Sequence, residues 1–339
     1  MVNAKRYISA NFSKSFLLTF LPFFLIISLV YLVRISSLTA KVKLSLSELL
    51  TLYSYSIPDI VFYTLPLSFV AALTNVLLRM STDNELIALY ALGLKANKVL
   101  KSLFMVSLLF SALLLTISLF AMPMTKQLYK SFKQEKRGEA KLNIVPGKLG
   151  QKFGDYYIYI KEKKDGTFHD LVIYNRTDEN KEQFFASKNG KLKQKNGQTS
   201  LLLNDGYGYT YSSDTLQQAK YSTLEAFDTS RKKNYHFENT VAYWKKAKHD
   251  KKIMHQLLFY IFVSLIPLLS VYLVAAFSMI NPRYQNNHSF LIIFSTTLLL
   301  YLLASSLKKW GNLSLLFFAI FLVLGGGAFL FHKRVARYF

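Results

Sequence analysis

Few side chains in this sequence of 339 residues have the types and spacing that chemistry needs. A phosphate-binding loop requires glycines whose backbone amides surround the phosphates, followed by a lysine and a hydroxyl residue. The two Gly-Lys pairs, Gly147-Lys148 and Gly190-Lys191, are each followed by leucine and lack the upstream glycine. The sequence therefore does not predict ATP binding by this chain.

Metal and nucleophile chemistry is equally unsupported by the sequence. The six histidines form no pair at metal-ligand spacing, there is no cysteine, and no Gly-x-Ser-x-Gly turn presents a serine. His169 and Asp170 fall within an expected strand, where a surface position is favoured over catalysis. We expect no catalytic residue, no metal and no cofactor, and therefore a protein that is not an enzyme.

The composition separates the chain into apolar and basic regions. It is 52% hydrophobic and carries a formal net charge of +23, which is unusual for one soluble domain. The stretch 123–252 holds 26 of the 42 lysines and arginines and 15 of the 19 acidic residues. Apolar runs that approach the roughly 20 residues of a membrane-spanning helix lie outside it, at 15–33, 57–78, 99–122, 253–279, 289–307 and 312–331. The pattern predicts a polytopic α-helical membrane protein with six transmembrane helices and one inserted domain.

Three regions follow from this pattern. Residues 1–122 form a first transmembrane half, 123–252 a β-rich domain with helical and basic connectors, and 253–339 a second transmembrane half with three spans. With both termini on one side, the short segments of that side carry eleven lysines and arginines, against five on the other side. Because cytoplasmic loops carry the basic excess, we expect both termini in the cytoplasm and the inserted domain outside.

The inserted domain has the pattern of short β-strands. Three dipeptides typical of hairpin turns occur in it, Asp165-Gly166, Asn189-Gly190 and Asn196-Gly197. Apolar and aromatic runs lie between them, at Tyr156–Ile160, Leu171–Tyr174, Thr199–Leu203 and Tyr207–Tyr211. The spacing predicts an all-β sandwich or jelly-roll-like domain. The composition of 126–141 indicates instead that the third span continues outward as a helix, and 228–252 reads as a basic connector.

A short apolar helix is expected at 81–95, between the second and third spans. Thr82 and Glu85 have the spacing of a capping box, Asp83 favours the helix N-terminus, and Gly93 suits the C-terminal end. Leu86 to Leu94 carries no charge but is too short to cross a bilayer. Two interpretations are about equally favoured by the residues: a helix docked into a partner's groove, or one packed on its own bundle.

Polar residues near the spans are the remaining candidates, because they are costly in the bilayer. Asp59, after Pro58, is expected to cap the second span, and Asn75 to bond a neighbouring helix. Gly325-Gly326-Gly327 allows close helix packing. Three basic residues follow the first span and could reach lipid headgroups or pair with phosphates of an anionic lipid; they are Arg34, Lys41 and Lys43.

These motifs together resemble the LptF/LptG (YjgP/YjgQ) family of lipopolysaccharide export permeases over nearly the whole chain. The most specific likeness is residues 81–95, STDNELIALYALGLK, and the others are Ile57-Pro58-Asp59 and Asn281-Pro282-Arg283. Asn281-Pro282-Arg283 and the spacing from Asp165-Gly166 to Asp170 look more like LptF than LptG.

The resemblance implies a subunit of an ABC-type export complex. Family members pair as an LptF–LptG heterodimer on two copies of the ATPase LptB, which would hydrolyse the ATP. Residues 81–95 would be the coupling helix in the ATPase groove, with contacts from Asp83, Glu85, Leu86, Leu89 and Gly93.

The resemblance also implies a path for the lipid. Lipopolysaccharide would enter from the outer leaflet of the bacterial inner membrane, where the first and fifth spans line lateral gates. Arg34, Lys41 and Lys43 would face its phosphates. The periplasmic jelly-roll-like domain would pass it to LptC and LptA-like proteins, joined edge to edge.

Two alternatives remain, and the second belongs to a different class of protein. A permease of the lipoprotein-release or mechanotransmission type also has an ATPase partner, but usually carries its large domain after the first of four spans. A membrane-anchored β adaptor without a transport role would pack the 81–95 helix on its own bundle.

Overall fold

The chain divides into two compact units. The computed structural model describes residues 4–39, 44–141, 145–153, 156–164, 166–178, 181–195, 198–212, 215–227, 237–281 and 288–337. The helical unit comprises Met1–Leu38, Leu44–Tyr129 and Phe237–Phe339. The sheet unit comprises Thr39–Lys43 and Lys130–His236.

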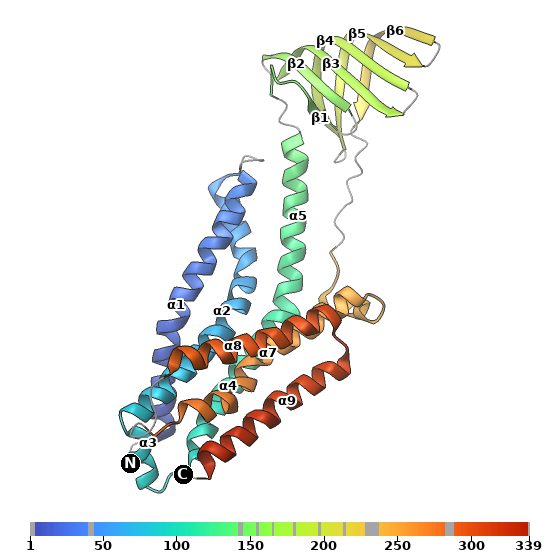
Figure 1. The fold of residues 1–339 in the computed structure, drawn as a ribbon. Coiled ribbons are helices and arrows are strands. Elements are labelled where there is room, and N and C mark those ends of the chain that lie inside the picture. Colours follow the sequence, from blue (N-terminus) through green and yellow to red (C-terminus); the bar gives the residue numbers. More distant parts are fainter. Residues whose placement is uncertain are drawn as a thin grey trace. The chain divides into compact units, whose positions relative to one another are not determined.

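Six helices of the described residues are long and apolar enough to cross a membrane (Figure 1). They are α1 (Ala4–Thr39), α2 (Leu46–Thr82), α4 (Ala96–Thr116) with its continuation, α7 (Lys251–Ser278), α8 (Ser289–Trp310) and α9 (Leu313–Phe331). Shorter elements are α3 (Glu85–Ala91), α6 (Thr240–Lys245), the 3-10 turn η2 (Lys246–Lys248) and the π-helical turn η3 (His332–Ala336). The predicted fold class, six transmembrane helices with an inserted β unit, is confirmed.

Helices α2 and α7 form the centre of the helical unit. In their most apolar windows, 78% of α2 and 67% of α7 is buried, against 11–28% for the other four. Helix α7 packs against α2, α4, α8 and α9. Gly327 of α9 allows one of these contacts, because a Cβ there would lie 3.2 Å from the backbone N of Leu273. This agrees with the packing role expected for the glycine triplet, although Gly325 and Gly326 have open space around them.

Helix α2 begins earlier than the sequence predicts. Its N-cap is Ser45, which forms a capping box with Glu48. Asp59 therefore lies within the helix, thirteen residues after its first residue, and the prediction that Asp59 caps the span is wrong. The preceding segment, LSELLTLYSYS, is less apolar than the run at 57–78, so the sequence did not mark it as part of the span. Its hydroxyl residues are nevertheless compatible with a membrane helix.

The third span continues as a helix beyond residue 122, as predicted. Helix α4 passes through the π-helical turn η1 (Ile117–Ala121) into α5 (Met122–Lys141). The returning chain is tied to this helix, since the Trp244 indole N–H donates to the carbonyl of Leu119 at 2.7 Å. Gln127 also donates to the Glu238 carbonyl at 3.1 Å and accepts from the Glu238 backbone N–H at 2.9 Å.

The described residues of the sheet unit form one antiparallel sheet with the order β1-β2-β3-β4-β5-β6. The strands are β1 (Gln151–Phe153), β2 (Tyr156–Lys164), β3 (Thr167–Asp178), β4 (Lys181–Lys195), β5 (Gln198–Ser212) and β6 (Thr215–Phe227). Each strand pairs with the next, so the described strands form a simple meander. The two packed sheets of a sandwich or jelly roll are not formed by these residues, because the connections join sequence neighbours directly.

Of the three predicted hairpin turns, one is formed, one is wrong and one lies outside the described residues. Lys164 pairs with Thr167 around Gly166, whose φ is +76°, as a hairpin turn requires, although Asp165 itself lies outside the described residues. Asn189-Gly190 lies inside β4 and is not a turn. A Cβ at Gly190 would lie 3.1 Å from the Leu171 side chain, so the glycine serves close packing there. Asn196-Gly197 lies outside the described residues. Thr199–Leu203 and Tyr207–Tyr211 are parts of a single strand, β5.

The two faces of the sheet differ. One face carries a buried apolar cluster, composed of Ile158, Ile160, Phe168, Leu171, Ile173, Leu201, Leu203 and Ala226. On the other face, Tyr157 pairs with Tyr174, Tyr174 with Phe184 and Phe184 with Tyr209, so aromatic side chains cross four strands. Tyr157 and Phe184 are partly exposed, at 44% and 41%.

Candidate functional site

Helix α3 is the expected short helix between the second and third spans, but its N-terminal end is built differently from the prediction. Its N-cap is Asn84, with a left-handed backbone (φ 58°) and no side-chain capping bond. The capping box of Thr82 and Glu85 is not formed, because α2 extends to Thr82, whose hydroxyl donates back to the carbonyl of Arg79 at 3.0 Å. A two-residue link joins α2 to α3, so Asn84 adopts the left-handed conformation that asparagine tolerates.

The C-terminal end of α3 follows the prediction for Gly93. Its φ is +79°, its N–H donates to the Tyr90 carbonyl at 2.9 Å, and the Leu94 N–H donates to the Leu89 carbonyl at 3.1 Å. This pair of bonds is a Schellman motif, which needs a left-handed residue at the position of Gly93. The motif stops the helix after two turns.

One face of α3 packs on its own helical unit. Leu86 is 3% exposed and belongs to the main apolar core, and Leu89 and Tyr90 pack against that core. Burial raises the pKa of the Tyr90 phenol above its usual range. Leu86 and Leu89, which the resemblance assigns to the ATPase groove, therefore contact this chain's own core.

The acidic residues at the start of α3 have partners within the chain. The Tyr7 hydroxyl of α1 donates to Glu85 Oε1 at 3.0 Å, which joins two residues 78 positions apart. Asp83 Oδ2 forms an ion pair with Arg79 Nε, four residues earlier on α2, at 3.5 Å. Both carboxylates assigned to partner binding thus have partners within the chain.

The opposite face of α3 is exposed and apolar. Leu92 is 80% exposed and Ile87 39%, and the small residues Ala88 and Ala91 lie exposed beside them. Gly93 is also exposed and has no atom within 4 Å of the position of a Cβ. Sequence reasoning missed Ile87 and Leu92; the alternation of one buried and one exposed apolar stripe at helical spacing was the signal that could have found them.

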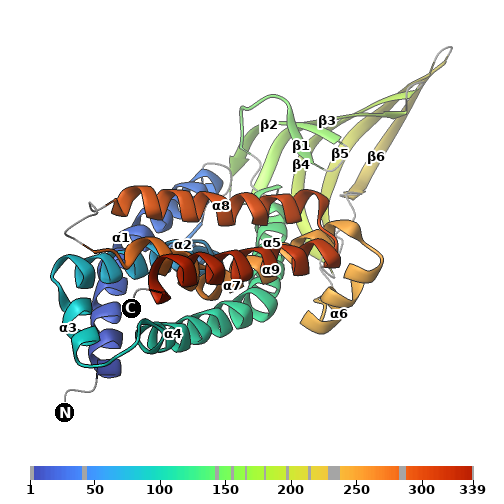
Figure 2. The same cartoon turned by 60° about the horizontal axis from the view of Figure 1, so that its bottom comes forward.

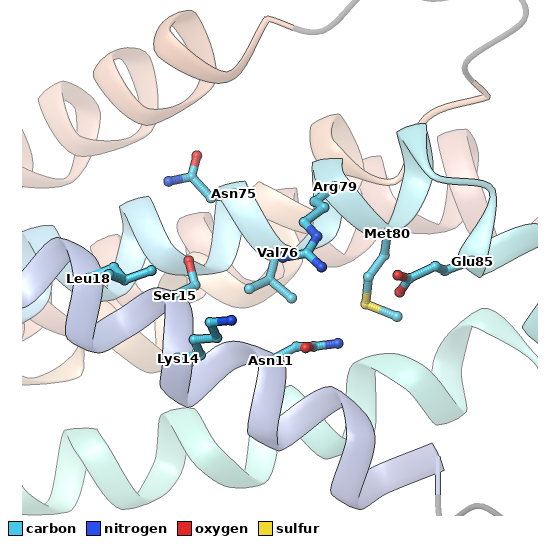
Figure 3. Close-up of a pocket in the computed structure, with 9 residues that line it drawn as sticks. All are labelled: Asn11, Lys14, Ser15, Leu18, Asn75, Val76, Arg79, Met80 and Glu85. Carbon is cyan, nitrogen blue, oxygen red and sulfur yellow. The ribbon is translucent and has the colours of Figure 1, made fainter.

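A cavity of about 120 Å³ lies between α1 and α2, next to α3. Figure 3 shows its nine lining residues, which are Asn11, Lys14, Ser15, Leu18, Asn75, Val76, Arg79, Met80 and Glu85. The hydrogen bond expected from Asn75 to a neighbouring helix is absent among the described residues; Asn75 is exposed and lines this cavity instead. Two cations, two amides and a carboxylate thus gather at one end of the helical unit.

The other basic site expected from the sequence lies at the far end of α1. Arg34 is exposed there, and its backbone carbonyl accepts a 2.7 Å hydrogen bond from the Ser37 hydroxyl. Lys41 and Lys43 lie outside the described residues. The structure therefore places one of the three predicted phosphate contacts, on an accessible helix surface.

An ionic cluster inside the helical unit joins three helices. Lys126 Nζ of α5 lies 3.9 Å from Asp59 Oδ1 of α2 and also contacts the Tyr260 hydroxyl of α7. The Gln256 side chain donates to the same hydroxyl at 2.7 Å. This cluster ties the base of α5 to the two central helices. Asp59 in an apolar run was the sequence signal for it.

Among the described residues, α3, the cavity and the Arg34 end of α1 offer surfaces for binding and no reaction centre. No group of three histidine, cysteine or acidic residues in this part of the chain could hold a metal ion. Six membrane helices with an inserted antiparallel sheet define a polytopic membrane protein. Residues 6–333 match the family described as Lipopolysaccharide export system permease LptF/LptG, and the chain belongs to this family. Comparison with individually curated proteins gives no match.

The match confirms the family predicted from residues 81–95, and it makes the chain a subunit of a lipopolysaccharide export permease in the inner membrane rather than an enzyme. It refers to LptF and LptG jointly, so the likeness to LptF stays a prediction.

Proposed function

We propose that the chain is one permease subunit of an ABC-type complex that extracts lipopolysaccharide from the inner membrane and passes it to a periplasmic bridge. It pairs with a paralogous, LptG-like subunit, and an LptB-like ATPase dimer docks on α3. ATP-driven closure of the ATPase pair pushes on α3, the spans narrow the cavity between the two permeases, and lipid moves up to the sheet unit.

The observation that carries this proposal is the exposed apolar face of α3. Leu92 and Ile87 lie on a helix too short to span a bilayer, and an apolar face left in water is unfavourable. The inner face of α3 is already occupied by the chain's own core, so the outer face is the one available to a partner's groove. We therefore assign the ATPase contact to Ile87, Ala88, Ala91, Leu92 and Gly93, with Glu85 holding α3 against α1 through its hydrogen bond with Tyr7.

The lipid-facing helices support pairing with a second permease. Helix α8 exposes a row of large apolar side chains, formed by Phe290, Leu291, Phe294, Leu298 and Leu302. Helix α1 does the same along its length. Surfaces of this kind suit lipid, a second subunit or a lateral gate, which is the role that the family resemblance gives to the first and fifth spans.

The orientation follows from the same end of the helical unit. The start of α1, α3 and the end of α9 lie together in both views (Figure 1 and Figure 2). The basic excess of the short segments belongs to this end, so we place it in the cytoplasm with both termini and the sheet unit in the periplasm. Exposed Arg34 then lies at the periplasmic end of α1, where it faces lipid phosphates with Lys41 and Lys43.

The sheet supports transfer to LptC and LptA-like proteins. Its edge strands are β1 and β6, and the thirteen residues of β6 (Thr215–Phe227) offer the longer edge. Exposed edges add strands of another protein through backbone hydrogen bonds.

The test is co-purification of an ATPase with the full chain from membranes, identified by mass spectrometry. We expect Leu92→Asp, alone and with Ile87→Asp, to reduce the recovered ATPase by about tenfold or more, since a buried charge disrupts an apolar contact. Leu216→Asp is the matched control, because Leu216 is 67% exposed on β6. Undiminished ATPase in the Leu92 variants, or none with the unaltered chain, would overturn the proposal and favour the β adaptor.

A further inference from the structure

The cavity between α1 and α2 is lined by positively and negatively charged side chains that form no ion pair with each other among the described residues. Lys14 of α1 makes no ion pair among the described residues, although the carboxylate of Glu85 lines the same cavity. In Figure 3 the Lys14 side chain points from α1 toward α2. A ligand that contacts both groups would complete the arrangement.

The cationic part of the cavity suits a phosphate. Arg79 joins Asp83 through Nε, with its side chain 64% exposed, and a guanidinium has five N–H donors in a planar fork. Asn11 and Asn75 bring amide groups to the same lining. Lysine, arginine and amide donors around one space are the groups that bind phosphate oxygens.

The carboxylate end suits a primary ammonium. Glu85 Oε1 accepts from Tyr7, whereas Oε2 is buried and has no hydrogen-bond partner among the described residues. A buried carboxylate oxygen without a donor is costly, and a cationic N–H donor at that position would remove the cost. Because the second charge has to be positive, a simple anion does not satisfy the whole lining.

An apolar strip leads away from the cavity along α1. Leu18 lines the cavity and is 68% exposed, and Leu21 and Leu25 follow at helical spacing with exposures of 59% and 53%. Side chains three and four residues apart share a helix face. A ligand with a charged head in the cavity and an acyl chain on this strip would match both surfaces.

We infer that the cavity binds the headgroup of an aminophospholipid from the leaflet on the α3 side, with the phosphate at Lys14 and Arg79 and the primary ammonium at Glu85. The phosphoethanolamine headgroup has both charges and three ammonium N–H donors. Phosphatidylcholine lacks those donors, and phosphatidylglycerol lacks the cation.

Native mass spectrometry of the full chain in detergent tests the inference, with phosphatidylethanolamine, phosphatidylcholine and phosphatidylglycerol of identical acyl chains as probes. We expect phosphatidylethanolamine to bind about tenfold more tightly than the other two. Glu85→Gln, which can still accept from Tyr7, should abolish this preference. Lys14→Gln should weaken all three lipids, while Lys98→Gln, an exposed lysine of α4 outside the cavity, should change nothing.

Each contrary result overturns a defined part of the inference. Equal binding of the three lipids, or a preference that survives Glu85→Gln, excludes the ammonium contact. Tightest binding of phosphatidylglycerol shows an anion site instead. Displacement of the lipid by soluble phosphoethanolamine at equal concentration shows a headgroup site that does not require a membrane lipid. Thermal unfolding of each variant confirms that it is folded.

Discussion

Helices α1 and α2 are almost equal in length but differ in what surrounds them. Helix α1 has the more apolar window, with a mean hydropathy of 2.6 and 11% of it buried, whereas the α2 window has 1.8 and is 78% buried. In a soluble protein the buried helix would be the more apolar one. In a bilayer the lipid-facing helix has to be apolar all round, which accounts for the difference between α1 and α2. Helix α7 does not follow the same order, since its window is 67% buried and has a mean hydropathy of 2.5.

The buried helix α2 is able to carry hydroxyl residues because its own backbone accepts their hydrogen bonds. Thr64, Ser68 and Thr74 donate to carbonyls four residues earlier, at 2.8–2.9 Å. Ser81 donates both to Leu77 and across to the Ser278 carbonyl of α7, at 2.9 and 3.0 Å. Small hydroxyl side chains also allow neighbouring helices to approach closely.

The largest expected difference in stability is between a core substitution in α2 and a surface substitution in α1. Phe69 of α2 is fully buried, with its ring centroid 5.0 Å from that of Phe12 and 5.5 Å from that of Phe110. Phe69→Ala should lower the free energy of unfolding by about 3–5 kcal/mol through the cavity it leaves. Leu25→Ala on the exposed face of α1 should change it by less than about 0.5 kcal/mol. Thermal and denaturant unfolding in detergent measure both; similar losses would contradict the comparison.

The second effect concerns the charged pair of the buried helix. Lys126→Gln leaves Asp59 without its cation, and we expect a loss of about 2 kcal/mol in the free energy of unfolding. Asp59→Asn in the same background should restore part of it, with a coupling of about 1 kcal/mol in a double-mutant cycle. Lys101→Gln, on an exposed position of α4, serves as control. Strictly additive losses would show that Asp59 and Lys126 do not interact.

A smaller effect is expected within the peripheral helix α9. Gly327→Ala brings a methyl group to 3.2 Å from the Leu273 backbone and 3.3 Å from the Tyr272 Cβ, and should cost about 1 kcal/mol of stability. Gly325→Ala meets open space and should stabilise the helix by up to about 1 kcal/mol. Unfolding of the two variants side by side tests whether α9 contacts α7 through one glycine face.

The smallest effect extends the comparison to the sheet, which carries its buried groups on one side only. Burial raises the pKa of Tyr221, against a smaller opposing hydrogen bond with Ser187, and its hydroxyl donates to the Ala186 carbonyl at 3.0 Å. The unfolded tyrosine loses its proton first, so this contribution is full below about pH 10 and declines as the pH rises above that value. Tyr221→Phe should reduce the alkaline loss of sheet stability, measured by circular dichroism. Tyr211→Phe, at an exposed position, should leave the loss unchanged.

Composition was sufficient for the membrane spans, because a bilayer demands long apolar runs and little else resembles them. The extension of the third span was also predictable, since residues 126–141 lack strand alternation. The turn predicted at Asn189-Gly190 was wrong because such dipeptides express only a local preference. The conformation there is decided by the Leu171 side chain and by the pairing of β4 with both neighbouring strands.

The candidate site was predictable in place but not in detail. Residues 86–94 carry no charge but are too few to span a bilayer, which predicted a short helix between the second and third spans, and Gly93 marked its end. Which stripe of α3 faces outward depends on the core that Leu86 enters, and the partner of Glu85 is Tyr7, far away in sequence. The cavity lined by Lys14 forms only when α1 and α2 lie side by side, so no local sequence pattern could predict it.

The length of α1 fixes the depth of α3. Lys14 and Arg34 are twenty residues apart with no charge between them, which at 1.5 Å per residue is about 30 Å, the thickness of the hydrocarbon core. Tyr7 precedes Lys14 by seven residues, so the Tyr7–Glu85 hydrogen bond holds α3 about 10 Å beyond that border. A thicker or thinner bilayer tilts or straightens such a helix, and α3 has to move with it.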